Sequence, residues 1–160
     1  MPYETAVVVL SDRVASGARE DGCIPAVRES LGEKFTLVRE RVFPDDPAAL
    51  QAELIELADR LRVPLVLTSG GTGLAPRDRT PQATSAVLDY EVPGIAEAMR
   101  AASAAFVPTA MLSRAVAGVR GSTLIVNLPG SPKAVRETLA AILGALPHAL
   151  DLLADTVSDG

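Results

Sequence analysis

The stretch VPLVLTSGGTGLAPRDRTPQAT, residues 63–84, joins an apolar run to a glycine-rich loop and then to a helix start. Its first part, VPLVLTS, has the length and the Val/Leu content of a strand buried on both faces. The three glycines of SGGTG leave backbone amides free to converge on an anion. Thr80, followed by Pro81, is typical of a helix N-terminus with threonine as the N-cap. The stretch therefore predicts a strand–loop–helix unit, whose glycines either receive a phosphate group or merely turn the strand into the helix.

The same alternation of short apolar runs and longer helical segments continues along the chain. Strands are predicted over 5–11, 36–43 and 63–69, and two more within 115–128 around a tight Arg-Gly-Ser turn. Helices are predicted over 24–35 with a closing turn, 47–61, 80–90, 93–104 and 131–146. This order predicts an α/β three-layer sandwich, a mostly parallel sheet with helices on both faces. We expect one domain over residues 1–160.

Two of the predicted helices carry clear start signals and one carries an apolar stripe. Asp46 and Ser131 are placed to cap the helices that begin at Pro47 and Pro132. Between 47 and 61, leucines recur at 50, 54, 57 and 61, the spacing of one helix face. That face is expected to pack against the sheet.

Composition excludes several classes of protein. The net charge is −5 and no long basic run occurs, so a nucleic-acid partner is not expected. No apolar run approaches the roughly 20 residues of a membrane helix, and the first residues lack the features of a signal peptide. Cys23, the single cysteine, has no internal disulfide partner, which fits a reducing compartment. We expect a cytoplasmic protein that does not bind membranes.

Polar or glycine-rich segments follow four of the predicted strands, at the edge where open parallel sheets bind ligands. They are LSDR (10–13), FPDDP (43–47), SGGTG (69–73) and NLPGSPK (127–133). Asp78 either supports the following helix electrostatically or binds Mg²⁺, and its position in the sequence favours neither. Lys133 either faces solvent or meets a phosphate near its helix start. Neither a Walker A motif nor a dinucleotide fingerprint is present.

The segments SDR, PDD, TSGGTGLAPRDRTPQAT, VPGIAEAMR, MLSRAVAGVRG and NLPGSPKAV together resemble the molybdopterin adenylyltransferase family. This Mog/MoaB-like family also includes the gephyrin G domain. The matching segments run from residue 11 to about 135, and LPHALDLL (146–153) extends them over nearly the whole chain. GGTG alone is weak, whereas GGTG-x3-RD-x-TP together with NLPGSPK is highly specific. The resemblance implies a molybdopterin-binding-like fold and the adenylation of molybdopterin by Mg-ATP, with release of pyrophosphate.

The resemblance also implies a role for each matching residue. The catalytic residues would be Asp45, Asp78 and Ser113, and the two aspartates would hold Mg²⁺. The substrate phosphate would be bound by Ser69, Gly70, Gly71, Thr72, Gly73, Arg77 and Thr80. The nucleotide would be bound by Ser11, Asp12, Asn127, Pro129, Gly130, Ser131 and Lys133. At the first long helix, DGCIP (21–25) departs from the family's Asp-x-Ser-Gly-Pro, with Cys23 and Ile24 in place of serine and glycine.

The required chemistry suits these residue types. A phosphate monoester is an anionic nucleophile near neutral pH, so the reaction needs no strong base, and the lone His148 is interpreted as structural. The main obstacle is Coulomb repulsion between two polyanions, which Mg²⁺ and glycine amides would offset.

Three alternative functions compete with an adenylyltransferase. The first is a MoaB-like protein that binds molybdopterin or a nucleotide without adenylating it, and intact Asp45, Asp78 and Ser113 argue against it. A gephyrin-like anchoring role and a CinA-type nucleotide enzyme rank lower, the latter because of MLSRAVAGVRG. TPQAT and MLSRAVAGVRG are closer to the Mog/gephyrin branch than to MoaB. The resemblance further implies a homotrimer and a possible handover of product to a molybdate-inserting protein.

Overall fold

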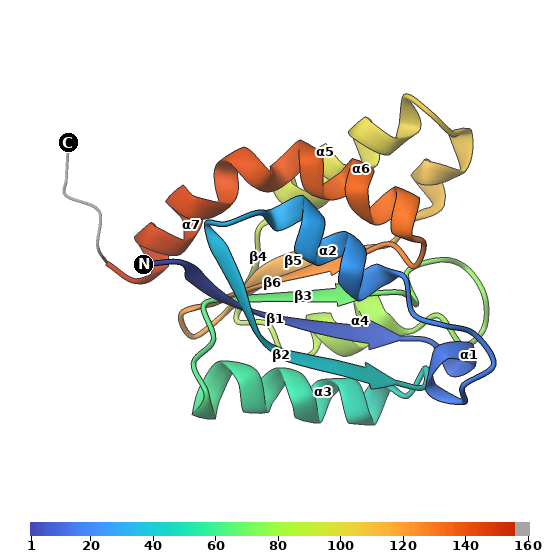
Figure 1. Ribbon diagram of the computed structural model, residues 1–160, viewed down its shortest axis with the longest axis horizontal. Helices are drawn as coiled ribbons and strands as arrows, with labels where there is room; N and C mark the ends of the chain where they lie inside the picture. Colours follow the sequence, from blue (N-terminus) through green and yellow to red (C-terminus); the bar gives the residue numbers. More distant parts are fainter. Residues whose placement is uncertain (156–160) are drawn as a thin grey trace.

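The computed structural model describes residues 1–155, in which six strands form one sheet in the order β2-β1-β3-β6-β5-β4 (Figure 1). The strands β2, β1, β3 and β6 run parallel, whereas β5 and β4 extend the sheet antiparallel. Their bounds are β1 (Tyr3–Leu10), β2 (Phe35–Phe43), β3 (Leu65–Ser69), β4 (Tyr90–Glu91), β5 (Ala117–Arg120) and β6 (Thr123–Leu128). The expected mostly parallel sheet is confirmed.

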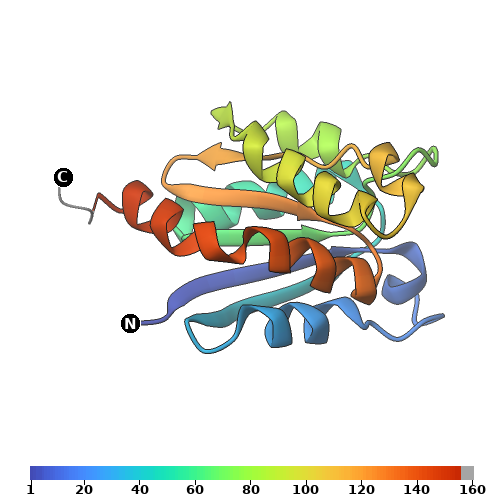
Figure 2. The same ribbon diagram turned by 90° about the horizontal axis from the view of Figure 1, so that it is seen from above.

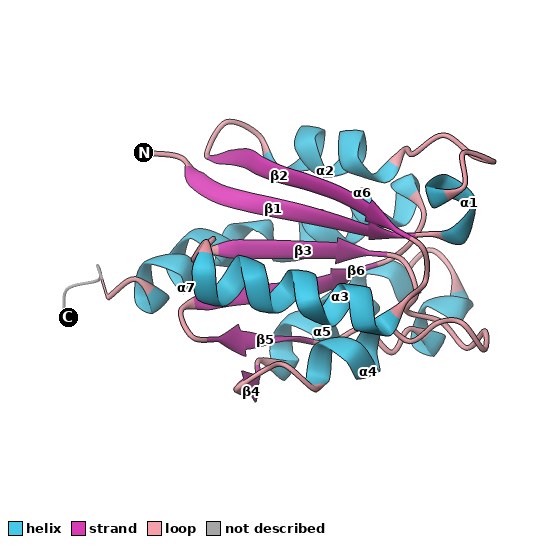
Figure 3. Cartoon of the chain, turned by 90° about the horizontal axis from the view of Figure 1, so that it is seen from below, coloured by secondary structure: helices cyan, strands magenta, loops and turns pink. Residues whose placement is uncertain are grey.

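Helices cover both faces of this sheet, which completes the expected three layers (Figures 1 and 3). One face carries α2 (Cys23–Leu31), α5 (Pro93–Ala104), α6 (Pro132–Ile142) and α7 (Leu146–Leu153). The other carries α3 (Pro47–Ile55), its π-helical continuation η1 (Glu56–Arg60) and α4 (Thr80–Ser85). Shorter turns are α1 (Asp12–Ala15), η2 (Pro108–Leu112) and η3 (Leu143–Ala145). Among residues 1–155, no helix is both long and apolar enough to cross a membrane.

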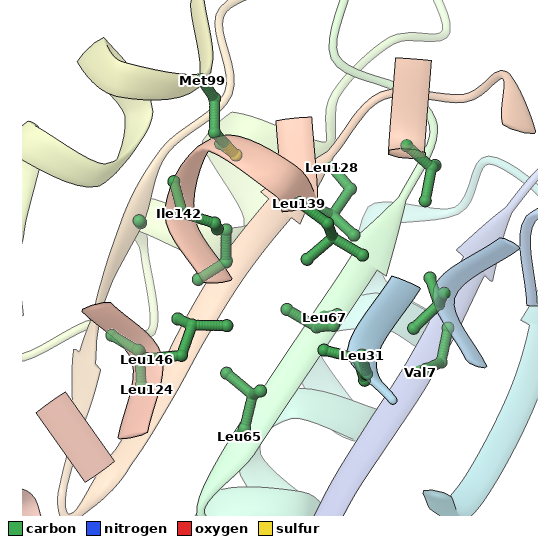
Figure 4. Close-up of a cluster of buried hydrophobic side chains, with 14 of the residues drawn as sticks. Val7, Leu31, Leu65, Leu67, Met99, Leu124, Leu128, Leu139, Ile142 and Leu146 are labelled. Carbon is green, nitrogen blue, oxygen red and sulfur yellow. The ribbon is translucent and has the colours of Figure 1, made fainter. Parts of the chain in front are cut away.

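The central strands carry mainly apolar side chains because each of their faces packs against a helical layer. In β3, Leu65 and Leu67 belong to the larger core cluster, which also contains Leu139 of α6 (Figure 4). Val66, between them, points to the other face and packs in a cluster with Leu54 of α3. All three β3 residues are fully buried. Alternation with period two inside a continuous apolar run is the property of a strand covered on both sides.

Most predicted helix boundaries hold, and two departures have local causes. Asp46 and Ser131 cap α3 and α6 as expected, each accepting hydrogen bonds from backbone amides of the first turn. The leucine stripe of α3 is buried except for its last member, Leu61, which is 37% exposed. The intervening π-helical turn winds fewer degrees per residue than an α-helix, so Leu61 falls outside the stripe.

The helix expected over 80–90 is shorter, and Thr80 is not its N-cap. The helix ends at Ser85, and Arg79 occupies the capping position without a side-chain hydrogen bond. The Thr80 amide instead donates to the Gly71 carbonyl at 3.1 Å, which ties the helix start to the glycine loop. After the helix, the Asp89 amide donates to Val119 at 2.7 Å and draws the chain into the short edge strand β4. Tertiary hydrogen bonds therefore override the local helical pattern.

An ion pair between η1 and the β5–β6 hairpin gives a testable pH dependence. Arg120 donates to both oxygens of the half-exposed Asp59, at 3.0 and 2.8 Å, and this lowers the pKa of Asp59 from its usual 3.8. A lowered pKa stabilises the fold above the unfolded-state value, and the stabilisation is lost as pH falls through the folded value. The melting temperature of Asp59→Asn should therefore lie below that of the wild type at pH 6, with the gap shrinking below pH 3.8. A gap that is constant across this range would contradict the assignment.

Candidate active site

The two glycine-rich loops that follow β3 and β6 pack against each other at the carboxyl edge of the sheet. The Gly70 amide donates to the Leu128 carbonyl at 3.1 Å, and Ser69 Oγ donates to the Pro129 carbonyl at 2.6 Å. A Cβ placed on Gly130 would lie 3.3 Å from Gly70 Cα. The parallel pairing of β3 with β6 brings the two strand ends to the same edge. The loops thus form one continuous backbone surface.

Two cavities flank this joint surface. The first, of about 380 Å³, lies at the ends of β1 and β3 and is called the strand-end cavity. Of the predicted site residues, it is lined by Ser11, Asp45, Ser69, Gly70, Gly71, Asp78, Gly130 and Ser131. The second, of about 340 Å³, is called the α5–α6 cavity after the helices that form its wall. Of the predicted site residues, it is lined by Thr72, Gly73, Ser113, Pro129 and Ser131. Both cavities therefore open onto neighbouring residues of the same two loops.

A network of charged groups joins the ends of β1 and β2 beside the strand-end cavity. Asp12 accepts two hydrogen bonds from Arg77, at 2.5 and 2.9 Å. The Asp45 amide also donates to Asp12, at 2.9 Å. Arg77 is the main cause that lowers the pKa of Asp12 to about 2, so Asp12 is ionised at neutral pH. Arg77, expected to bind phosphate, is here the partner of Asp12, and its side chain is 64% exposed.

The two aspartates predicted to hold magnesium share one electrostatic environment. Burial raises the pKa of Asp45, a hydrogen bond from the Asp12 amide opposes the rise, and the charges of Asp12 and Asp78 add to it. Asp78 follows the glycine loop in the chain and lines the same cavity, and its Oδ2 accepts from the Ala75 amide at 3.1 Å. Within residues 1–155, no group of three acidic, histidine or cysteine side chains could hold a metal ion. Two carboxylates that line one cavity with the first glycine loop nevertheless fit Mg²⁺, which commonly takes one or two carboxylates and completes its shell with phosphate and water.

Three residues predicted to touch ligand lie elsewhere. Thr80 is buried behind Gly71, in a small space it shares with Asp45 and Arg77. Lys133 is 83% exposed, lines neither cavity, and lies 3.9 Å from Glu137 one turn along α6. Asn127 is fully buried. Its amide donates to the hydroxyls of Thr68 and Thr84, and its Oδ1 accepts from the Val116 amide. The polar atoms of the Asn127 side chain are thus engaged inside the protein, and its assignment to the nucleotide site stays a prediction.

Asn127 joins β3, α4 and the segment before β5 through its side-chain hydrogen bonds, and this structural role is testable. Asn127→Ala would leave two buried hydroxyls and one backbone amide without their partner. We expect it to lower the free energy of unfolding by about 2–3 kcal/mol, measured by chemical denaturation. Thr84→Val, which disturbs only one of these bonds, should cost less. A loss for Asn127→Ala no greater than that for Thr84→Val would contradict the supporting role.

Cys23 lines the strand-end cavity and forms a hydrogen bond to its wall. Its thiol donates to the Gly130 carbonyl at 3.4 Å, in contact with the second glycine loop. Burial is the largest cause that raises the pKa of Cys23, so the thiol is neutral at pH 7. Ile24 points into the core instead. Asp21 accepts from the amides of both residues, which fixes the start of α2.

Several residues that build the site escaped the sequence interpretation. Arg114 donates to the carbonyls of Gly73 and Asp78, at 3.0 and 2.6 Å, and thereby ties the end of the first glycine loop to the segment that carries Asp78. Arg100 holds the backbone of Ser113 and Ala115 in the same way. Arg114 stands directly after the predicted Ser113 in MLSRA, so its position was a usable signal. His148 lies exposed on α7 and lines neither cavity.

A mostly parallel sheet covered on both faces, with glycine loops and cavities at its carboxyl edge, is the architecture of α/β proteins that bind ligands at their strand ends. The chain belongs to the family described as probable molybdopterin binding domain, which matches residues 6–148. It is 49% identical over 142 residues to the molybdopterin adenylyltransferase of Escherichia coli K12, covering 87% of this chain and 73% of that protein.

Solved structures agree with this membership. The molybdopterin biosynthesis enzyme MoaB from Thermus thermophilus shares 50% identity with a TM-score of 0.91, over 96% of this chain and 97% of that chain. The molybdopterin biosynthesis Mog protein from Mycobacterium ulcerans shares 42% identity with a TM-score of 0.86, over 97% and 99%. Both branch names occur among these similar structures, so the names do not decide between the Mog and MoaB branches. The predicted family is confirmed.

Proposed function

We propose that this protein transfers an adenylyl group from Mg-ATP to the terminal phosphate of molybdopterin, as a step of molybdenum cofactor biosynthesis. The observation that carries the proposal is the pair of glycine loops packed against each other between two cavities, beside Asp45 and Asp78. Its 49% identity to a protein named molybdopterin adenylyltransferase supports the same reaction. Both substrates are phosphate esters, and their phosphates have to meet at one place.

In the proposed reaction, an oxygen of the molybdopterin phosphate forms a bond to the α-phosphorus of ATP. The bond between that phosphorus and the bridging oxygen of the β-phosphate breaks, and pyrophosphate leaves with the bonding electrons. The attacking phosphate is already anionic, so the chain needs to orient it rather than remove a proton. Gly70 and Gly71 both have positive φ, and because the Gly70 amide is engaged by Leu128, the amides that follow it would face the phosphates. Ser113, on the wall of the α5–α6 cavity, lies near the other side of that loop.

Asp45 and Asp78 are the residues that would hold the magnesium ion. When bound, Mg²⁺ would neutralise phosphate charge and favour attack on the α-phosphorus. The strand-end cavity would take the nucleotide, because Ser11, Gly130 and Ser131 line it next to the phosphate loop. Arg77 would remain on Asp12 and limit the net negative charge that two polyanions encounter.

The direct test mixes purified protein with freshly released molybdopterin, ATP and Mg²⁺, and measures adenylyl-molybdopterin and pyrophosphate by chromatography. We expect both products in equal amounts, and neither when Mg²⁺ is chelated. Tight molybdopterin binding without product would favour the alternative of a binding protein that does not adenylate. Absence of binding to either substrate would refute the proposal.

Three further parts of the proposal concern the protein's setting. We propose that it works as a homotrimer, which light scattering of the purified chain would measure directly. The free Cys23 thiol fits action in the reducing cytoplasm. Adenylyl-molybdopterin would then pass to a protein that inserts molybdate, and co-purification with such a protein would test the handover.

A further inference from the structure

The segment between α1 and α2, residues 16–22, brings an arginine to the wall of the strand-end cavity. Arg19 lines that cavity, as do the next three residues of the segment. Its side chain is exposed and, within residues 1–155, takes part in no hydrogen bond or ion pair. A guanidinium is always charged and carries five N–H donors. Arg19 therefore offers this cavity a full positive charge and a set of donors that the protein itself does not use.

The backbone that carries Arg19 is held on both sides of it. The Arg19 amide donates to the Arg13 carbonyl at 3.1 Å. Further along, the Asp21 carboxylate accepts two backbone hydrogen bonds at the start of α2. A Cβ placed on Gly22 would lie 2.8 Å from Pro132 Cγ, so the end of the segment packs directly against the start of α6. Figure 2 shows this segment (blue) at the same end of the molecule as the start of α6 (orange). Arg19 is thus an exposed side chain on a well-anchored backbone.

Arg19 is the only cation that lines the strand-end cavity in the part of the chain that the structure describes. The other charged side chains of the wall are acidic, namely Glu20, Asp21, Asp45 and Asp78. A nucleoside triphosphate carries more negative charge than one Mg²⁺ ion neutralises, and these carboxylates would repel the remainder. A triphosphate that binds in this cavity therefore has one cationic side chain on which to place its unneutralised phosphates.

The electrostatics of two other groups show which part of the wall Arg19 serves. Burial raises the pKa of Cys23, and the charge of Arg19 acts against that rise. The Cys23 thiol contacts the Gly130 carbonyl of the second glycine loop. Burial also raises the pKa of Asp45, but the charges that modify it come from other residues, including Asp78. Arg19 therefore acts on the side of Cys23 and the second glycine loop, apart from the two carboxylates that would hold Mg²⁺.

We propose that Arg19 binds the β- and γ-phosphates of ATP in the strand-end cavity and stabilises them as they leave as pyrophosphate. The inference rests on the proposed function for the choice of ligand. When the bond between the α-phosphorus and the bridging oxygen breaks, the bonding electrons stay on the pyrophosphate and its negative charge grows. A cation placed beside that group offsets the new charge, and the planar guanidinium fork matches two phosphate oxygens. Arg19 then lets the cavity distinguish a triphosphate from a monophosphate.

The first test measures binding of Mg-ATP and of AMP by calorimetry, without molybdopterin. Arg19→Gln should weaken Mg-ATP binding about tenfold or more, while AMP binding should change by less than about twofold. Arg13→Gln is the matched control, because it removes the same charge from an exposed position of α1 that does not line the cavity. It should bind both nucleotides as the wild type does. Unchanged Mg-ATP binding in Arg19→Gln, or an equal loss in Arg13→Gln, would overturn the inference.

A structural role for Arg19 predicts a different result. Because the Arg19 side chain has no hydrogen-bond or ion-pair partner among the described residues, Arg19→Gln should keep the wild-type melting temperature. A lowered melting temperature together with an equal loss of ATP and AMP binding would show that Arg19 supports the segment and not the phosphates.

Inorganic pyrophosphate probes the leaving-group position directly. It should compete with Mg-ATP for the wild type, and its inhibition constant should rise about tenfold or more in Arg19→Gln. In the active enzyme the same variant should raise KM for ATP and lower kcat, and leave KM for molybdopterin unchanged. A rise in KM for molybdopterin alone would place the other substrate at Arg19 and refute the assignment.

The binding measurements need no turnover, so they separate the inference from the proposed function. A protein that loses Mg-ATP affinity in Arg19→Gln but makes no adenylyl-molybdopterin would retain the phosphate-binding role and lose the adenylyltransferase proposal. An active enzyme in which Arg19→Gln keeps the wild-type KM for ATP would lose only the inference. A wild type that binds no ATP would refute both.

Discussion

Asp78→Asn is expected to lower the rate of adenylyl transfer by about 10²–10³-fold, the loss found when one group that stabilises transition-state charge is removed. Asparagine is nearly the same shape and can still accept the hydrogen bond from the Ala75 amide. The glycine loop should therefore keep its conformation. The variant loses the negative charge that would hold Mg²⁺ beside the transferred group. The measurement is the initial rate of pyrophosphate release with saturating molybdopterin and ATP.

Asp46→Asn provides the matched control for this loss of charge. Asp46 lies next to Asp45 in sequence but caps α3 by accepting from the Ala48 and Ala49 amides. Asparagine is an equally good N-cap, so neither stability nor rate should change appreciably. Melting temperatures of all three proteins would show that they are equally folded. Wild-type rates in Asp78→Asn would exclude Asp78 from the metal site.

The fold could be predicted from the sequence because most residues of its central strands are apolar. Strands such as β3 are covered on both faces, so they appear as mainly apolar runs, and β6 follows the same pattern around Asn127. The β4 edge strand was missed because Tyr90 and Glu91 are exposed and carry no apolar pattern. Its formation depends on hydrogen bonds to β5, which local sequence does not encode.

Some residues of the candidate site could be predicted because their backbone conformation requires a particular residue type. Others could not, because only the packing of distant helices and strands brings their side chains together. Gly70 and Gly71 were identifiable because positive φ is costly for other residues. Asn127 stands beside the second glycine loop, yet its side chain points into the core. Ser103 and Glu137 look like ordinary helical residues in the sequence. Only the packing of α5 against α6 places them in one cavity.

Gly70→Ala is expected to lower the free energy of unfolding by about 3–5 kcal/mol, combining backbone strain with a steric clash. Gly70 has φ of +104°, a conformation that L-residues rarely adopt. An added Cβ would overlap the Leu10 carbonyl oxygen. That oxygen belongs to the end of β1, a central strand that cannot move aside as a flexible side chain could. The melting temperature should fall by about 10 °C or more.

Gly121→Ala and Gly17→Ala separate the two causes of this loss. Both glycines have positive φ, +59° and +81°, but an added Cβ would meet nothing within 4 Å. They should cost only the backbone strain, about 1–2 kcal/mol each. If Gly70→Ala costs no more than these controls, the close contact between the first glycine loop and β1 is looser than the structure indicates. If it costs several kcal/mol more, Gly70 is required by the end of β1 itself. The same close packing that forbids a side chain there keeps the Gly70 backbone on the wall of the strand-end cavity.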